Sequence, residues 1–244
     1  HGILNSTVYA APAGESLALL TDAAFALGPA RKTSVHLFAT ACWTGVLSLS
    51  SAKASTLSSA ELCQALGFEA ETLSNISPFD SLLAATPLGG KSGDRLFWVA
   101  QASRSELRIV EDTLARRGAR LAGFAHPGGL PRNLSGHAGA GWGRSELWGD
   151  SAVCLGCGEK GGLRLQVFAA FGEHGEWLNE AQAWFAEQGI AHSIERLVAP
   201  GLPPGDGAEV AYDLNDEKRL GDWLTAWADE ISGQAPGAPV LHSP

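Results

Sequence analysis

Arg95-Leu-Phe-Trp-Val-Ala-Gln-Ala102, followed by Ser103–Arg117 and Gly118–Phe124, is the stretch that decides the fold of this chain. It has the pattern of an apolar strand, an amphipathic helix that ends at a glycine, and a second strand. The same order returns over Leu163–Ile194, with its helix at Glu176–Gln188. Two such units predict an α/β protein with a duplicated architecture.

The remaining pattern predicts how the chain is divided. We expect a first α/β lobe over residues 1–130, a Gly-rich connector over 131–150, a second, smaller α/β lobe over 151–232 and a disordered tail over 233–244. The further elements expected are helices over Glu15–Gly28, Ser59–Leu73 and Lys218–Ile231, a central strand over Val35–Cys42, and a hairpin over Ala152–Phe171.

Composition limits the classes of function. The net charge is −9 and only 17 Lys and Arg residues are spread along 244 positions, which argues against nucleic acid and anionic membrane surfaces as partners. No apolar run is long enough to cross a bilayer, so we expect no direct membrane insertion. Four cysteines without a dense pattern, and an N-terminus without a signal-peptide pattern, predict a reducing, cytoplasmic location.

Cys154-Leu-Gly-Cys157 is the sharpest short motif. A CxxC turn can hold two thiolates on one zinc ion or form a redox disulfide. Structural zinc needs four ligands, so Cys42, Cys63 and His174 would have to converge on the pair from distant positions. The alternative is that both cysteines pack as small apolar residues of a hairpin.

Two further sets of residues have the composition of a site. Gly136–Arg144 is rich enough in glycine to cradle phosphate, although no convincing strand precedes it and no helix follows, and a mobile connector is the alternative. His126, Asp150 and Ser151 have the types of a hydrolytic triad without its nucleophile-elbow motif.

Six of the eight tryptophans and two of the histidines divide into expected core and expected surface. Core positions are predicted for His36, His192, Trp177, Trp184, Trp223 and Trp227, which lie in strands or on the apolar stripes of helices. Trp142 and Trp148 lie in or beside the Gly-rich loop. We expect them to anchor a protein partner, the alternative being that they fold back over a sheet edge.

The stretch Val35–Arg132 resembles a known family. After the central strand comes Ala60-Glu-Leu-Cys-Gln-Ala-Leu-Gly-Phe-Glu-Ala-Glu-Thr-Leu73, then Pro78-Phe-Asp80, then Leu96–Leu107 and Arg116–Gly123. This order is similar to that of the actin-like proteins of type IV pilus assembly and of the cytoplasmic domain of L-type type II secretion proteins.

The resemblance implies an actin/Hsp70-like (ribonuclease H-like) fold with duplicated lobes, mixed sheets and flanking helices. It also implies a cytoplasmic scaffold that recruits a protein partner, such as the tail of a membrane protein, and that can bind ATP with Mg²⁺. The family holds nucleotide at an Asp-x-Gly hairpin near the start of each half. Here Gly2–Thr7 has no Asp, and Val153–Gly158 places Cys154 at the Asp position, where a thiol cannot supply the carboxylate charge.

We therefore carry over the fold and the scaffold role, and no nucleotide-binding residue. The sequence predicts a non-catalytic actin-like scaffold of a pilus or secretion-type assembly, with no required cofactor. The alternatives are a nucleotide-binding ATPase of the same superfamily, or a metal or thiol protein that uses Cys154 and Cys157.

Overall fold

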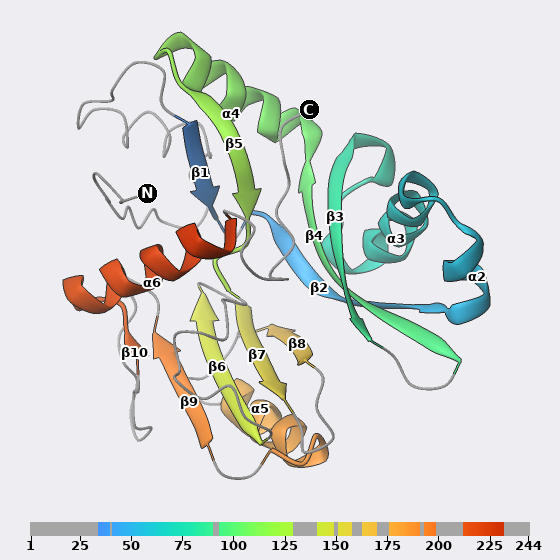
Figure 1. The fold of residues 1–244 in the computed structure, drawn as a ribbon, viewed down its shortest axis with the longest axis vertical. Coiled ribbons are helices and arrows are strands. Elements are labelled where there is room, and N and C mark those ends of the chain that lie inside the picture. Colours follow the sequence, from blue (N-terminus) through green and yellow to red (C-terminus); the bar gives the residue numbers. More distant parts are fainter. Residues whose placement is uncertain are drawn as a thin grey trace. The chain divides into compact units, whose positions relative to one another are not determined.

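The computed structural model describes residues 34–39, 41–89, 93–128, 141–148, 151–157, 163–169, 176–190, 193–198 and 212–231 (Figure 1). The chain divides into two compact units. The N-terminal unit is Tyr9–His126 with Pro239–Pro244, and the C-terminal unit is Pro127–Ala238 with His1–Val8. The predicted helix at 15–28 and the tail at 233–244 lie outside the described residues.

An antiparallel sheet of order β2-β4-β3 forms one part of the N-terminal unit. Its strands are β2 (Trp43–Ser50), β3 (Ser81–Gly89) and β4 (Asp94–Ser103). The helices α2 (Ser51–Thr56) and α3 (Ser59–Ser74) and the 3-10 turn η1 (Pro78–Asp80) belong to the same part. Leu66 and Ala70 of α3 pack with Phe97 of β4 in one buried core cluster.

A second sheet of the N-terminal unit pairs β1 (Ser34–Phe38) with β5 (Arg120–Ala125) in parallel. Between β4 and β5 runs α4 (Arg104–Arg116), so the predicted strand–helix–strand order is confirmed. Leu107, Val110 and Leu114 of α4 are buried in the core as the stripe predicts. Gly118 takes a φ of 76°, the left-handed conformation that closes the helix.

Hydrogen bonds fix the start of α3. The Ser58 backbone N–H donates to Glu61 Oε2 at 2.8 Å, and the Glu61 N–H donates back to Ser58 Oγ at 3.4 Å. These two bonds form a capping box and make Ser58, rather than the neighbouring Ser59, the N-cap of α3.

Two expectations for this unit are wrong. Val35–Cys42 does not form one central strand: β1 ends at Phe38, it pairs with β5 alone among the described strands, and His36 is exposed rather than in the core. Leu73, whose spacing from Leu62, Leu66 and Ala70 predicts a place on the inner face of α3, is also exposed. It lies in the last turn, beyond Ala70, where the buried cluster ends.

The C-terminal unit has one five-stranded sheet of order β10-β9-β6-β7-β8. The strands are β6 (Trp142–Trp148), β7 (Ser151–Cys157), β8 (Leu163–Ala169), β9 (Ser193–Val198) and β10 (Tyr212–Asp213). β6 lies in the middle, antiparallel to β7 and parallel to β9. The predicted β7–β8 hairpin pairing is confirmed. A connector over 131–150 is wrong for 142–148, because these residues form the central strand.

The helices of this unit are α5 (Glu176–Glu187) and α6 (Glu217–Ile231). Trp177, Ala181 and Phe185 of α5 pack on Ala152 and Cys154 of β7. Of the helices in the described ranges, none combines the length and apolar character that crossing a membrane requires.

Both predicted strand–helix–strand pieces therefore exist, in different sheet surroundings. In the C-terminal unit, β8 and β9 belong to one sheet, with β7 and β6 between them. In the N-terminal unit, β2 and β3 occupy both edges of β4, so β5 pairs with β1 instead.

Candidate functional site

The central strand β6 has a polar stripe on one of its faces. Alternation along the strand places Trp142, Arg144, Glu146 and Trp148 on the same face. The other face lies under α5, since a Cβ added at Gly143 would stand 2.7 Å from Phe185 Cε1. The sequence thus sets two charged side chains between two tryptophans inside the sheet.

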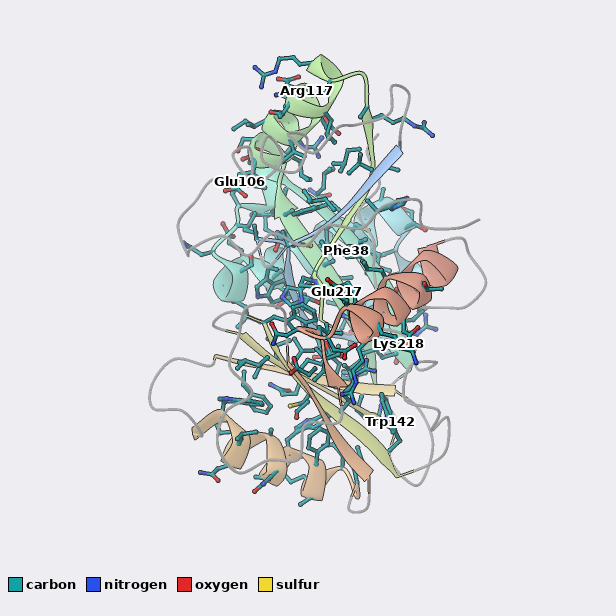
Figure 2. All side chains as sticks on the ribbon, turned by 90° about the vertical axis from the view of Figure 1, so that its left-hand side faces the viewer. Phe38, Glu106, Arg117, Trp142, Glu217 and Lys218 are labelled. Atoms are coloured by element: carbon teal, nitrogen blue, oxygen red, sulfur yellow. The ribbon has the colours of Figure 1, made fainter. Side chains whose placement is uncertain are left out.

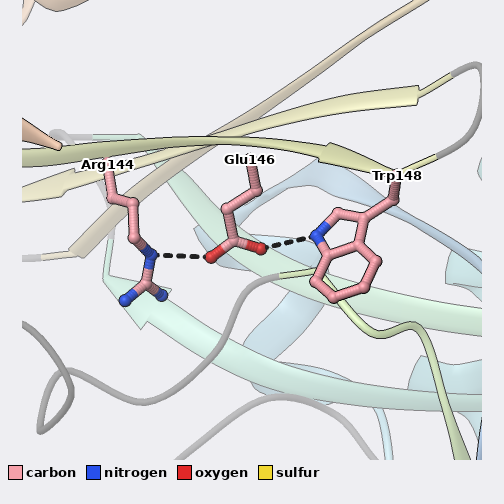
Figure 3. Close-up of polar contacts among 3 residues, drawn as sticks. All are labelled: Arg144, Glu146 and Trp148. Carbon is pink, nitrogen blue, oxygen red and sulfur yellow. Dashed lines mark hydrogen bonds and ion pairs between the residues drawn. The ribbon is translucent and has the colours of Figure 1, made fainter. Parts of the chain in front are cut away.

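A buried ion pair and a hydrogen bond connect this stripe (Figure 3). Arg144 Nε donates to Glu146 Oε1 at 2.7 Å, and the Trp148 indole N–H donates to Glu146 Oε2 at 2.8 Å. The Arg144 and Glu146 side chains are 2% and 0% exposed. Arg144 Cζ lies 5.3 Å from the centre of the Trp142 ring, within the range of a cation–π contact.

This arrangement stabilises a particular strand register. An isolated buried charge is costly, and the pairing here leaves both carboxylate oxygens of Glu146 with a donor. A shift of β6 by one residue would move Arg144 and Glu146 to the face under α5, away from these partners. We therefore assign the stripe a positioning role in the fold, since the Glu146 carboxylate is already occupied by Arg144 and Trp148.

Trp142 and Trp148 are not exposed anchors for a partner. They are 3% and 6% exposed, and Trp148 packs against Trp223 of α6 with ring centres 5.5 Å apart. The neighbouring glycines suggested a loop. A signal for a strand was present in the sequence, namely large side chains at every second position from Trp142 to Trp148. Among the described residues the indole N–H of Trp142 has no hydrogen-bond acceptor.

Cys154 and Cys157 both belong to β7, and of the two only the Cys154 side chain is among the described residues. Cys154 is buried beneath α5; burial, with a smaller contribution from the Glu146 charge, raises the pKa of its thiol to about 12. Within the described ranges, no three His, Cys, Asp or Glu residues are grouped so that they could hold a metal ion.

The other described cysteines of the zinc hypothesis belong to the N-terminal unit. Cys42 is buried in the core of the N-terminal unit, where burial raises the pKa of its thiol to about 12. Cys63 belongs to α3, and partial burial raises its thiol pKa as well. The Cys157 side chain and His174 lie outside the described residues.

Most residues of the predicted triad and part of the phosphate loop lie outside the described residues. His126 is buried at the end of the N-terminal unit, whereas Asp150 and the Ser151 side chain lie outside the described residues. Residues 136–140 of the Gly-rich loop also lie outside them, and the segment that follows is β6, not the helix that a phosphate loop needs.

Cys154, which the resemblance places at the Asp position of a nucleotide-binding hairpin, does not lie at the connection between two strands. The first hairpin of the C-terminal unit pairs β6 with β7, so Cys154 lies within the second strand of that hairpin. Residues 149–150, which connect the strands, and Gly2–Thr7 lie outside the described residues.

The core assignments of several aromatic residues are confirmed. Trp177 and Trp223 are buried, and Trp184 is half-buried and packs with Phe185 at 5.1 Å between ring centres. His192 and the Trp227 side chain are outside the described residues. Figure 2 shows Trp142 in the C-terminal unit, and Glu106 and Arg117 at the two ends of α4.

Sequence reasoning missed a set of surface residues. Phe68 on α3 and Phe79 in η1 are exposed, although both are aromatic. A signal was present, since Phe68 lies off the buried stripe that contains Leu66 and Ala70.

Comparison with known proteins gives the fold. No family model matches the chain, and no curated protein matches it. The cytoplasmic domain of EpsL, an inner-membrane component of the type II secretion system of Vibrio cholerae, matches with a TM-score of 0.52 and 13% identity, over 86% of this chain and 80% of that one.

Two further solved structures are similar. The PilM–PilN type IV pilus biogenesis complex matches with a TM-score of 0.53 and 14% identity, over 78% of this chain and 72% of the other. A Bacteroides thetaiotaomicron protein with an actin-like ATPase fold and unknown function matches with a TM-score of 0.47 and 8% identity, over 88% of this chain and 76% of the other. The chain therefore has the actin-like α/β fold of the EpsL cytoplasmic domain and of PilM.

Proposed function

We propose that the chain is a non-catalytic, actin-like scaffold that binds the cytoplasmic tail of a membrane protein in a pilus or secretion-type assembly. The observation that supports this proposal is the shared fold: one similar structure is the cytoplasmic domain of an inner-membrane component, and another was solved as a complex of two proteins. The proposal places the chain in the cytoplasm, at the inner side of a membrane.

The chemistry of the described residues is compatible with this role. The buried carboxylate of the central strand, Glu146, is engaged by Arg144 and Trp148. The buried thiols of Cys42 and Cys154 have pKa values near 12 and so stay protonated at neutral pH. The side chains of Glu146, Cys42 and Cys154 therefore belong to the interior of the fold, and the partner would bind at the surface of the chain.

The test is capture of a membrane partner. The purified chain is immobilised and exposed to detergent-solubilised membrane proteins of its own cell, with an unrelated protein of similar net charge as the control. We expect one membrane protein to be enriched through its cytoplasmic tail, so that a version without the tail is no longer retained. Retention that does not depend on the tail, or no enrichment over the control, contradicts the scaffold role.

A further inference from the structure

An aromatic pair stands on the surface of the N-terminal unit. Phe68 of α3 and Phe79 of η1 are 44% and 81% exposed. Their rings pack edge to face, with centres 5.6 Å apart and an interplanar angle of 80°. Water-exposed phenylalanines that touch each other form an apolar surface which a partner can cover with a gain in free energy. We call these two residues the Phe68–Phe79 platform.

Packing and hydrogen bonds fix the η1 turn that contains Phe79. Pro78 lies against α3, with its Cβ 3.4 Å from the point where a side chain on Gly67 would begin. The Phe79 backbone N–H donates to Ser77 Oγ at 3.4 Å. Asp80 Oδ2 accepts hydrogen bonds from the hydroxyls of Ser103 at 3.1 Å and Ser105 at 2.9 Å. A surface ordered in advance loses little conformational freedom when a partner binds.

Carboxylates lie beside the platform on α3. Glu69 and Glu71 are exposed, and Glu71 lies one helical turn after Phe68. On the η1 side the charges are mixed, because Arg104 Nη2 donates to the Ser81 carbonyl oxygen at 3.2 Å, next to Asp80. The negative side of the platform is therefore the α3 side, which favours a positively charged ligand there.

We propose that the Phe68–Phe79 platform docks a basic segment of a partner protein that carries an apolar anchor flanked by Lys or Arg. The apolar anchor covers the two rings, and the cations face Glu69 and Glu71 on α3. Cytoplasmic segments next to membrane spans are enriched in Lys and Arg, so a membrane partner of the proposed scaffold offers this chemistry. The inference thus rests on the proposed function and adds to it a surface and a ligand class.

A synthetic peptide tests the surface directly. The probe is a fluorescein-labelled peptide with a central Leu-Phe pair between two Lys pairs, and its binding to the purified chain is followed by fluorescence anisotropy. We expect Phe79→Ser to weaken binding about tenfold or more, as loss of an aromatic anchor does at protein interfaces. Ile109→Ser is the matched control, because Ile109 is an exposed apolar residue (53%) on α4, and it should leave binding unchanged.

A second pair of variants tests the charge. Glu69→Gln with Glu71→Gln should weaken binding several-fold and reduce its dependence on salt. Glu180→Gln with Glu187→Gln removes the same charge from exposed positions of α5 and should have no effect. Equal effects of the two double variants, or of Phe79→Ser and Ile109→Ser, would overturn the proposal. Circular dichroism checks that each variant is folded.

Two other outcomes have a defined meaning. If the chain forms dimers that Phe79→Ser dissolves, a second copy covers the platform and the basic-peptide proposal is wrong. If Phe79→Ser retains the membrane partner as well as the unaltered chain does, the docking surface is wrong while the scaffold function stands. If neither protein retains a partner, the scaffold function itself has failed.

Discussion

Removal of the Glu146 carboxylate is the most informative perturbation of the C-terminal unit. In Glu146→Ala, Arg144 keeps a buried positive charge and loses the carboxylate 2.7 Å from its Nε. Breaking one side of a buried ion pair costs about 3–5 kcal/mol, and a buried donor without its acceptor costs about 1–3 kcal/mol. The second cost applies to the Trp148 indole N–H. Because these costs overlap, we expect a loss of about 4 kcal/mol in the free energy of unfolding.

A double variant separates charge pairing from packing. Arg144→Met with Glu146→Leu removes both charges and leaves the Trp148 N–H as the group without its acceptor. We expect it to lose only about 1–3 kcal/mol, which makes it more stable than Glu146→Ala alone. That order, in which two substitutions cost less than one, is the signature of a buried pair.

The assay is urea unfolding followed by tryptophan fluorescence and by circular dichroism. Trp43 and Trp98 belong to the N-terminal unit, and the other six of the eight tryptophans belong to the C-terminal unit, so fluorescence reports mainly on the unit that is perturbed. Glu180→Ala, at an exposed position of α5, is the control and should stay within about 0.5 kcal/mol of the unaltered chain. A cost below about 1 kcal/mol for Glu146→Ala would refute the reasoning. So would a double variant whose loss equals the sum of the losses of Arg144→Met and Glu146→Leu measured singly.

Three further predictions follow from the packing, the thiols and the helix caps. Gly156→Ala should destabilise the chain by about 1–3 kcal/mol in the same urea assay, because its Cβ would stand next to Ile190 Cδ1 and 3.1 Å from the Trp142 carbonyl oxygen. Gly221→Ala, which meets open space in α6, should be neutral or stabilising by up to about 1 kcal/mol. Equal effects would show that the packing of Ile190 on β7 is wrong. In native protein at pH 8, iodoacetamide should label Cys63 before Cys42 and Cys154, whose thiol pKa values are raised to about 12, as read by peptide mass spectrometry. The thiols of Cys42 and Cys154 hold their protons more tightly in the folded chain than at their ordinary pKa of 9.0. Their contribution to stability is therefore complete below about pH 9 and decreases as the pH rises towards 12. Rapid labelling of Cys154 at about pH 8 would contradict its burial. Ser58→Ala should cost about 1 kcal/mol of stability through loss of the capping box, and Ser59→Ala should cost less than half of that, so a larger effect at Ser59 would reassign the cap.

Local patterns were sufficient for much of the fold. The capping residues Ser58 and Ser103, the stripe Leu107, Val110 and Leu114, and the glycine that closes α4 are signals within one or two helical turns, and the structure has each of them. The resemblance to actin-like assembly proteins used the order of such elements, and the solved structures confirm that fold.

What the sequence missed depends on contacts between distant segments. β6 contains Arg144 and Glu146, which are rare in a central strand, and only their pairing with each other and with Trp148 makes their burial possible. The same central position buries Trp142 and Trp148, which were expected at the surface. Phe79, for which the sequence predicted no role, is exposed beside Pro78, which packs on Gly67, a contact that no local pattern indicates.

The measurement that tests the proposed role most directly is calorimetric titration of the purified full chain with ATP and Mg²⁺, together with an assay of phosphate release. A scaffold that works by binding a protein should show no micromolar heat of binding and no phosphate release above a protein-free blank. Micromolar affinity for ATP with Mg²⁺, accompanied by turnover, would contradict that role and make the chain a nucleotide-using member of the actin-like fold.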